Sequence, residues 1–382
     1  MKKLLFVILA WTLGGLGMLI PRKPGLIVFS QARNRYSGNS RALFEWMARN
    51  DHQAYWLYAR GFTPVELPEA SSRFVARAGL AGFLLCARAE FAVISHGGSD
   101  FGIFWPLAKR ARVIMLWHAI GIKRAGITDH KATPAGCRER LRETRFYSMC
   151  IASSDIDCYN TAAFQGVDVR RVSVTGLPRA DVYLHNRESE ITHVDRFKVL
   201  YAPTFRDYDL DRPLFFPFDD LDDAALRGFF AEQPDMEIHL RPHPNDTDSN
   251  IQAEQLAAGF PDNIKLLTEK IVGDVDSVLH QYEAIVTDYS SIYMEPLLAD
   301  VPPIFVNFDL REYLSTRGMA YDYDLVTPGP KVGSTTEMLK ALSDARRGAP
   351  GWAEHREQVR KMFFTHRDAN ACSRVFDAMK AL

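Results

Sequence analysis

Short, uninterrupted apolar runs alternate along the chain with longer segments in which apolar side chains recur at helical spacing. Six of these runs lead directly into polar residues: 26–29, 91–94, 113–116, 198–201, 237–240 and 284–286. Apolar strands that alternate with helices are typical of parallel sheets covered on both faces. Open α/β sheets bind their ligands at the carboxyl ends of the strands, where these polar residues gather. The pattern therefore predicts an α/β fold with its functional groups at that edge.

Two such sheets are expected, because the polar stretch 185–196 separates the runs into two groups. A chain of 382 residues also exceeds the roughly 100 to 200 residues of a typical domain. We therefore expect an N-terminal domain over 22–187 and a C-terminal domain over 188–382.

The first residues form a different kind of segment. Residues 4–20 are uncharged and apolar, and the basic pair Arg22-Lys23 follows them. The run exceeds the core of a signal peptide, lacks an A-x-A cleavage site and shows no polar face. It falls just short of the roughly 20 residues of a membrane span. We expect residues 1–21 to be an uncleaved membrane-anchor helix, spanning or interfacial, with the next domain at the cytoplasmic face of the cell membrane.

Charge is divided unevenly between the two halves. The chain as a whole carries a net charge of −1, which excludes the strongly basic class of nucleic-acid-binding proteins. Residues up to Glu190 nevertheless hold 26 Lys and Arg against 15 Asp and Glu, and the remainder holds 20 against 32. The basic run 123–145 is either a solvated face or a surface that rests on anionic lipid. The two halves are therefore expected to meet different partners.

The sequence motifs of several common enzyme classes are absent. No G-x-G-x-x-G follows a strand, and the P-loop, H-E-x-x-H and G-x-S-x-G motifs do not occur. The five cysteines include no C-x-x-C pair, which argues against a zinc site or a disulfide framework and fits a reducing compartment. Acid-x-acid triplets begin at Asp209, Asp246, Asp274 and Asp322. We interpret them as solvated loops, so no metal site is assigned, although Mg²⁺ needs few protein ligands and stays an alternative.

A phosphate-binding segment is predicted at 287–291, between a strand and a helix expected over 292–298. Hydroxyl groups and free N–H groups at a helix start suit phosphate, and plain helix capping is the alternative. Arg206 and Arg241 follow the apolar runs 198–201 and 237–240 of the same domain. A guanidinium group suits phosphate oxygens, and a surface ion pair is the alternative role for each arginine. The predicted phosphate ligands are Arg206, Arg241, Thr287, Asp288, Ser290 and Ser291.

Histidines stand at comparable strand ends of the two domains. His118 follows one strand in the N-terminal half, and His243 follows another in the C-terminal half. Imidazole is well matched to general-base work near neutral pH, so both are candidate catalytic residues. His96, before Gly97-Gly98, is similar, but we interpret it as structural.

The ordered motifs together resemble one family, the CDP-glycerol glycerophosphotransferases of teichoic acid and capsule synthesis. The segments that carry the resemblance are W-H at 117–118 with Lys123, Y-A-P-T-F-R-D at 201–207, R-P-H-P at 241–244, T-D-Y-S-S at 287–291, the loop 36–40, G-L-P-R-x-D at 176–181, and 302–313. The sequence departs from the family pattern at Ala119-Ile120-Gly121, where the family has Gly-Thr-Pro, and at Ala369, where it has glycine.

The resemblance implies a GT-B fold of two Rossmann-like domains with a cleft between them and a last helix that crosses back. It implies transfer of glycerol phosphate from CDP-glycerol to a hydroxyl of a lipid-linked glycan or polyol-phosphate acceptor at the membrane surface, with release of CMP. His118 would take the acceptor proton, His243 and Arg206 would stabilise the phosphoryl group, and Asn39 and Lys123 would lie on the acceptor side. The alternatives are CDP-ribitol or a nucleotide sugar as donor, or a donor-binding scaffold without activity.

Overall fold

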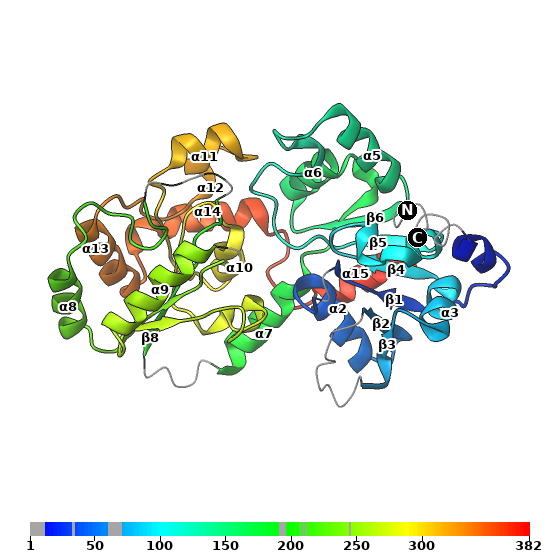
Figure 1. Ribbon diagram of the computed structural model, residues 1–382, viewed down its shortest axis with the longest axis horizontal. Helices are drawn as coiled ribbons and strands as arrows, with labels where there is room; N and C mark the ends of the chain where they lie inside the picture. Colours follow the sequence, from blue (N-terminus) through cyan, green and yellow to red (C-terminus); the bar gives the residue numbers. More distant parts are fainter. Residues whose placement is uncertain are drawn as a thin grey trace. The chain divides into compact units, whose positions relative to one another are not determined.

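The computed structural model describes residues 12–32, 35–59, 71–190, 196–206, 208, 210, 212–243 and 246–382 (Figure 1). The chain divides into two compact units. The N-terminal unit comprises Met1–Ile120, Ala125–Val182 and Asp368–Leu382. The C-terminal unit comprises Gly121–Arg124 and Tyr183–Arg367. Each unit is built around its own parallel sheet, which confirms the α/β architecture expected from the apolar runs.

The N-terminal unit contains a parallel sheet of seven strands in the order β3-β2-β1-β4-β5-β6-β7. The strands are β1 (Ile27–Phe29), β2 (Ala54–Tyr58), β3 (Phe74–Ala76), β4 (Phe91–Ile94), β5 (Arg112–Met115), β6 (Tyr147–Ala152) and β7 (Val172–Val174). All residues of β1 and β4 are buried, as uninterrupted apolar strands should be. Strand order reverses between β1 and β4, and ligands bind at such switch points in open sheets.

Helices accompany this sheet. They are α2 (Gly38–Arg49), α3 (Leu80–Arg88), α4 (Trp105–Ala108), α5 (Pro134–Thr144), α6 (Asp155–Gln165) and α15 (Ala371–Lys380). Helix α7 (Pro178–Glu190) begins in this unit and ends in the C-terminal unit. Helix α2 starts at Gly38, because Ser37 is extended and serves as the N-cap residue. This start matters for function, since it places Asn39 in the first turn of a helix.

The C-terminal unit contains a parallel sheet of five strands in the order β10-β9-β8-β11-β12. The strands are β8 (Phe197–Tyr201), β9 (Met236–Leu240), β10 (Ile264–Leu266), β11 (Ala284–Thr287) and β12 (Pro303–Phe305). The helices are α8 (Asp223–Glu232), α9 (Thr247–Gly259), α10 (Met294–Leu297), α11 (Leu310–Thr316), α12 (Tyr323–Val326), α13 (Thr335–Arg346) and α14 (Ala353–Phe363). The helix predicted over 292–298 is instead a 3₁₀ turn, Ser291–Tyr293, followed by the short α10.

Part of the predicted anchor lies within the described residues. Residues 12–17 are helical, and Leu13 and Ile20 pack against the core of the N-terminal unit. Leu16, Met18 and Leu19 are exposed. Residues 1–11 lie outside the described part of the chain, and within that part no helix is long and apolar enough to cross a membrane.

Helix α15 closes the N-terminal unit from the far end of the chain. In Figure 1 this red helix lies beside the blue α2, and the Trp46 and Phe376 rings meet at 5.9 Å. The carboxylate of Asp181 in α7 accepts the N–H groups of Ala371 at 2.8 Å and Cys372 at 2.7 Å. The first N–H groups of a helix have no acceptor within the helix itself. The Asp181 carboxylate supplies this acceptor, so a residue distant in sequence caps α15.

We expect Asp181→Ala to lower the free energy of unfolding by about 1–3 kcal/mol, because two buried N–H groups lose their acceptor. Urea unfolding of the full chain measures this change. Asp168→Ala is the matched control, since Asp168 caps an exposed turn together with Arg170 and its loss should leave stability unchanged. Equal stability of the two variants would show that this cap does not hold α15 in place.

Candidate functional site

The strand end after β5 carries His118 in a constrained turn. Trp117, which precedes it, has a φ of +54°, in the left-handed region that costs a residue with a bulky side chain of order 1–3 kcal/mol. Such a conformation persists only where the surrounding structure enforces it, and strained residues of this kind cluster at functional sites. The orientation of His118 is therefore set by its neighbours.

Asn39 is one of these neighbours. Its Nδ2 donates to the carbonyl oxygens of Leu116 and Trp117, both at 3.2 Å, and its Oδ1 accepts the N–H of Arg179 at 3.2 Å. The residue is only 1% exposed. Asn39 was expected on the acceptor side, and its contact with an acceptor stays a prediction; in the structure its amide is bonded to the backbone and fixes the turn that carries His118. The side chain of Arg179 completes the arrangement by donating to the His118 carbonyl at 2.9 Å.

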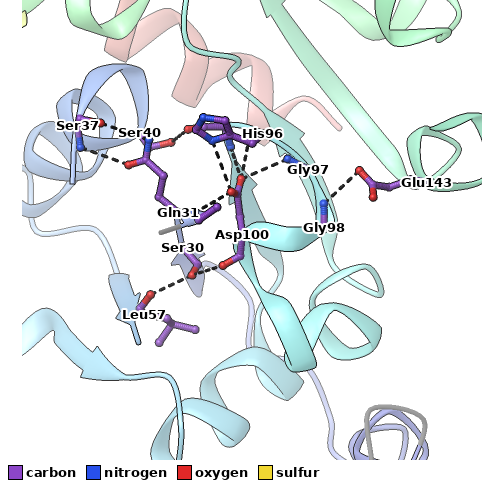
Figure 2. Close-up of polar contacts among 12 residues, drawn as sticks. Ser30, Gln31, Ser37, Ser40, Leu57, His96, Gly97, Gly98, Asp100 and Glu143 are labelled. Carbon is purple, nitrogen blue, oxygen red and sulfur yellow. Dashed lines mark hydrogen bonds and ion pairs between the residues drawn. The ribbon is translucent and has the colours of Figure 1, made fainter. Parts of the chain in front are cut away.

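A buried carboxylate organises the adjacent strand end, after β4. Oδ2 of Asp100 accepts the N–H groups of Ser95 and His96, both at 2.8 Å, and Oδ1 accepts that of Ala32 at 2.9 Å. Figure 2 shows these contacts converging on Asp100, with Gly97 on the same side. The sequence analysis did not single out Asp100, although S-H-G-G-x-D directly after a strand is the signal that could have identified it.

The His118 imidazole lies between two aromatic rings. Its centroid is 4.8 Å from that of His96, with an interplanar angle of 15°, and 4.2 Å from that of Trp117. The residue as a whole is exposed. Desolvation by the surrounding chain, followed by the electrostatic effects of His96 and Arg179, lowers the pKa of His118 to about 4. The ring is therefore neutral near pH 7 and able to accept a proton.

In the C-terminal unit, the strand-end loops converge on Arg206. Its Nε and Nη2 donate to the Asp309 carboxylate at 2.7 and 2.9 Å, and its Nη1 lies 2.8 Å from Oδ2 of Asp288. The side chain is 2% exposed, and its guanidinium lies 4.7 Å from the centre of the Tyr289 ring and 5.3 Å from that of Tyr313. The charge is fully compensated inside the protein.

Two predicted phosphate ligands belong to this network. Arg206 is bonded to Asp309 and paired with Asp288. The Asp288 carboxylate in turn accepts the Thr204 N–H at 2.9 Å and that of Tyr289. Both residues hold the loops together, and their contact with a phosphoryl group stays a prediction. The role of Asp309 was missed, because the D-L-x-x-Y motif at 309–313 gives no local sign that its carboxylate points to Arg206.

Two further predicted ligands also join strand ends. Thr287 is buried, and its hydroxyl donates to the Ala202 carbonyl at 2.8 Å. Nη1 of Arg241 donates to the carbonyl oxygens of Leu267 at 3.0 Å and Val272 at 2.6 Å. Thr287 therefore closes the contact between the loop after β8 and strand β11, and Arg241 holds the loop after β10. The predicted contact of these two residues with phosphate stays a prediction.

The serines of the predicted phosphate segment are half-buried at the end of β11. Oγ of Ser290 accepts the N–H of Ile292 at 3.3 Å, which is the geometry of a cap. Ser290 and Ser291 thus lie at the ligand-binding edge of the sheet, and their contact with phosphate stays a prediction.

Lys123 belongs to the C-terminal unit, whereas the sequence analysis placed it on the acceptor side. Its Nζ donates to Oγ1 of Thr204 at 3.2 Å and lies 5.8 Å from the centre of the Tyr313 ring. Desolvation lowers the pKa of Lys123 to about 8; Asp288 opposes this effect, and Arg206 adds to it. The ammonium therefore lies at the end of β8, on the edge where the predicted phosphate segment also lies.

His243 follows β9 on the same edge and is exposed. Its ring lies 4.9 Å from that of Phe205, and its carbonyl accepts the N–H of Asp246 at 3.0 Å. The predicted general position at a strand end is therefore correct, and the imidazole is accessible to a ligand.

The acidic triplets have structural roles where they are described. Asp246, Asp274 and Asp322 accept N–H groups at the starts of α9, a 3₁₀ turn and α12. Asp209 lies outside the described residues. Within the described ranges, no three His, Cys, Asp or Glu side chains gather in a way that could hold a metal ion.

Comparison with known proteins adds the following. The family described as CDP-glycerol:poly(glycerophosphate) glycerophosphotransferase matches residues 16–380. The teichoic acid poly(ribitol-phosphate) polymerase of Bacillus spizizenii is 27% identical over 72% of this chain, which spans 45% of that protein. The teichoic acid glycerol-phosphate transferase of Staphylococcus aureus is 25% identical over 93% of this chain and 92% of its own. The solved structure of the wall teichoic acid polymerase TagF superposes with a TM-score of 0.71 at 21% identity, over 94% of this chain and 89% of that one.

Arg206→Met should lower the free energy of unfolding by about 3–5 kcal/mol, because Asp288 and Asp309 are left buried without a counter-charge. Urea unfolding measures the loss. Arg212→Met, which removes an exposed pair with Asp219, is the control and should have a small effect. A stable Arg206→Met protein with weakened affinity for CDP-glycerol would show instead that the guanidinium binds the ligand.

Proposed function

Because the chain belongs to the CDP-glycerol:poly(glycerophosphate) glycerophosphotransferase family, we propose that it transfers glycerol phosphate from CDP-glycerol to an acceptor hydroxyl and releases CMP. The family match over residues 16–380 carries this proposal. The relative from Staphylococcus aureus, named a glycerol-phosphate transferase and matched over nearly its whole length, supports it. The site contributes a neutral imidazole at the strand edge of the N-terminal unit.

His118 is the general base of this reaction. As a neutral imidazole, it removes the proton from the acceptor hydroxyl while that oxygen attacks the phosphorus attached to glycerol. The bond from this phosphorus to the bridging oxygen then breaks, and CMP leaves. Asn39 and Arg179 hold the backbone on either side of the imidazole, so the base is in position before the acceptor arrives.

The donor phosphates bind at the strand edge of the C-terminal unit. Lys123 supplies a cation, and Thr204, Ser290 and Ser291 supply hydroxyl groups. His243 is exposed on this edge and stabilises the charge of the transferring group. Arg206 acts indirectly, since it holds the loop that carries Thr204.

We further propose that the acceptor is a lipid-linked glycan or polyol phosphate at the cytoplasmic face of the membrane. The exposed apolar side chains Leu16, Met18 and Leu19 precede the basic pair Arg22-Lys23, an order that suits an interface with anionic lipid. A helix over 1–21 would extend this contact. The excess of basic residues in the N-terminal half is consistent with a phosphate-bearing acceptor.

CDP-ribitol is the second candidate donor. The Bacillus spizizenii relative that supports it is named a poly(ribitol-phosphate) polymerase, and this chain spans less than half of its length. A scaffold without activity is less favoured. The departure at 119–121 leaves His118 in place, and Ile120 in that departure is a buried core residue.

The donor is tested by measuring CMP release from CDP-glycerol, CDP-ribitol and UDP-sugars in the presence of membrane extract. We expect release from CDP-glycerol, and a 10²- to 10⁴-fold lower rate for His118→Ala with unchanged CDP-glycerol binding by calorimetry. His355→Ala is the control, because His355 belongs to α14 of the C-terminal unit, where its Nε2 contacts the Leu325 carbonyl. Preference for CDP-ribitol would reassign the donor, and no release from any donor would favour the scaffold.

Lys123 should make donor affinity depend on pH. An anion binds the protonated ammonium, and the pKa of Lys123 is about 8, so affinity for CDP-glycerol should fall as the pH rises through that value. Lys123→Met should weaken binding at pH 7 by about 10- to 150-fold and abolish this pH dependence. Calorimetry from pH 6.5 to 9.5 measures both. The exposed Lys340→Met is the matched control, and cytidine, which has no phosphates, should bind both variants equally; a variant at Lys123 with wild-type behaviour would remove this residue from the donor site.

A further inference from the structure

The loop after β4 is built around one carboxylate and carries a second histidine. Besides three backbone N–H groups at 2.8–2.9 Å, Asp100 faces the ring of His96, whose Nδ1 lies 3.6 Å from Oδ1 (Figure 2). This nitrogen is shielded from water and makes no hydrogen bond within the described part of the chain. The Asp100 carboxylate is therefore the counter-charge that His96 faces.

The backbone of this loop requires the glycine that follows His96. Gly97 has a φ of +151°, and a Cβ added there would lie 2.6 Å from Oε1 of Glu143. The next N–H, that of Gly98, donates to the same oxygen at 3.1 Å. On its other side, the His96 carbonyl accepts a hydrogen bond from Nη1 of Arg140 at 3.4 Å. The position of His96 is thus determined by contacts on several sides.

The free face of the His96 ring meets His118. The two imidazoles are nearly parallel, at 15°, with centroids 4.8 Å apart, and both follow strands that are neighbours in the sheet. His96 and Trp117 also line a pocket of about 430 Å³ with Lys131 and Arg140. The His96 ring lies near the buried Asp100 carboxylate and stacks on His118, the proposed base. Packing of the hydrophobic core does not explain this position, because the His96 side chain remains 34% exposed.

We propose that His96, oriented by Asp100, is the positioning residue of His118: the stacked ring of His96 fixes the plane of the His118 imidazole. This inference rests on the proposed role of His118 as the base. Contact between two rings restricts rotation of His118 about its side-chain bonds, so its nitrogen points in one direction before the acceptor binds. Asp100 acts through His96 and does not itself contact His118.

The groups that face His118 give this proposal an electrostatic signature. After desolvation, His96 and Arg179 lower the pKa of His118, whereas a hydrogen bond to the Ser95 backbone and the charge of Asp100 raise it. Burial alone would raise the pKa of Asp100, but hydrogen bonds from His96 and Ser95 keep it below its usual range, so the carboxylate is ionised. Replacing His96 by an uncharged ring should therefore move the pKa of His118 upward, toward the ordinary value of about 6.5.

His96→Phe and His96→Ala separate the two effects. The phenyl ring keeps the stack and removes the titratable group, so we expect the acid limb of the pH–rate profile for CMP release to move upward while the plateau stays within about threefold of wild type. Alanine loses both, and we expect the same movement with a plateau about 10-fold lower. His130→Phe is the matched control and should change neither the limb nor the plateau.

Titration of ¹³C-labelled histidine by NMR, with His118 assigned from His118→Gln, gives a readout that does not need activity. We expect the His118 signal of His96→Phe to titrate at higher pH than in wild type. If CMP release fails in wild type while this movement is seen, the proposed function is wrong and the coupling of the two rings stands. Superimposable titrations of wild type and His96→Phe would overturn the proposal, as would a loss confined to the acceptor KM, which would place His96 in the acceptor pocket instead.

Discussion

A guanidinium ion without access to water governs the ligand-binding edge of the C-terminal unit. An uncompensated charge at the site of Arg206 would cost several kcal/mol, so the chain brings Asp288 and Asp309 to it from the loops after two other strands. The hydroxyls of Tyr208 and Tyr289 then satisfy Asp309 at 2.6 and 2.8 Å. Loops that are far apart in sequence are thereby fixed to one point. Groups beside them, such as the half-buried Lys123, are thereby held in position.

The loops of the N-terminal unit are also fixed by buried polar side chains. There the side chains bond to backbone groups, whereas in the C-terminal unit two carboxylates pair with the buried Arg206. Asn39 satisfies two carbonyl groups and one N–H, and Asp100 satisfies four N–H groups, all at strand ends. A strand that ends inside a sheet leaves polar backbone groups without partners, and buried groups of this kind must be paired. Their pairing determines how Trp117 and His118 turn. Reactivity at this edge therefore depends on residues that do not touch a substrate.

The sequence predicted the architecture better than the roles of individual residues. Apolar runs locate the strands because a strand buried on both faces needs apolar side chains at successive positions. The polar residues that follow these strands do gather at one edge of each sheet. The partners of these residues could not be predicted. Arg206 and Asp309 are 103 positions apart, and no local feature shows that they pair. Asn39, Thr287 and Asp288 were therefore expected to face a ligand, although their side chains turn inward to the backbone. Pro296 falls within the helix predicted over 292–298, and the segment forms a 3₁₀ turn and one short helix instead.

The order of segments along the chain restricts how this protein can be divided. Residues 121–124 belong to the C-terminal unit, where Lys123 forms a β-bridge with Met319 and Ile122 accepts the N–H of Ala320, although the chain on both sides belongs to the N-terminal unit. The N-terminal unit in turn includes the last residues, 368–382. A gene fragment that starts at residue 183 would encode the C-terminal unit without Lys123. A fragment that ends at residue 182 would encode the N-terminal unit without α15. No single cut in the chain therefore separates the two units, and exchange of one contiguous segment between relatives would carry residues of one unit into the other.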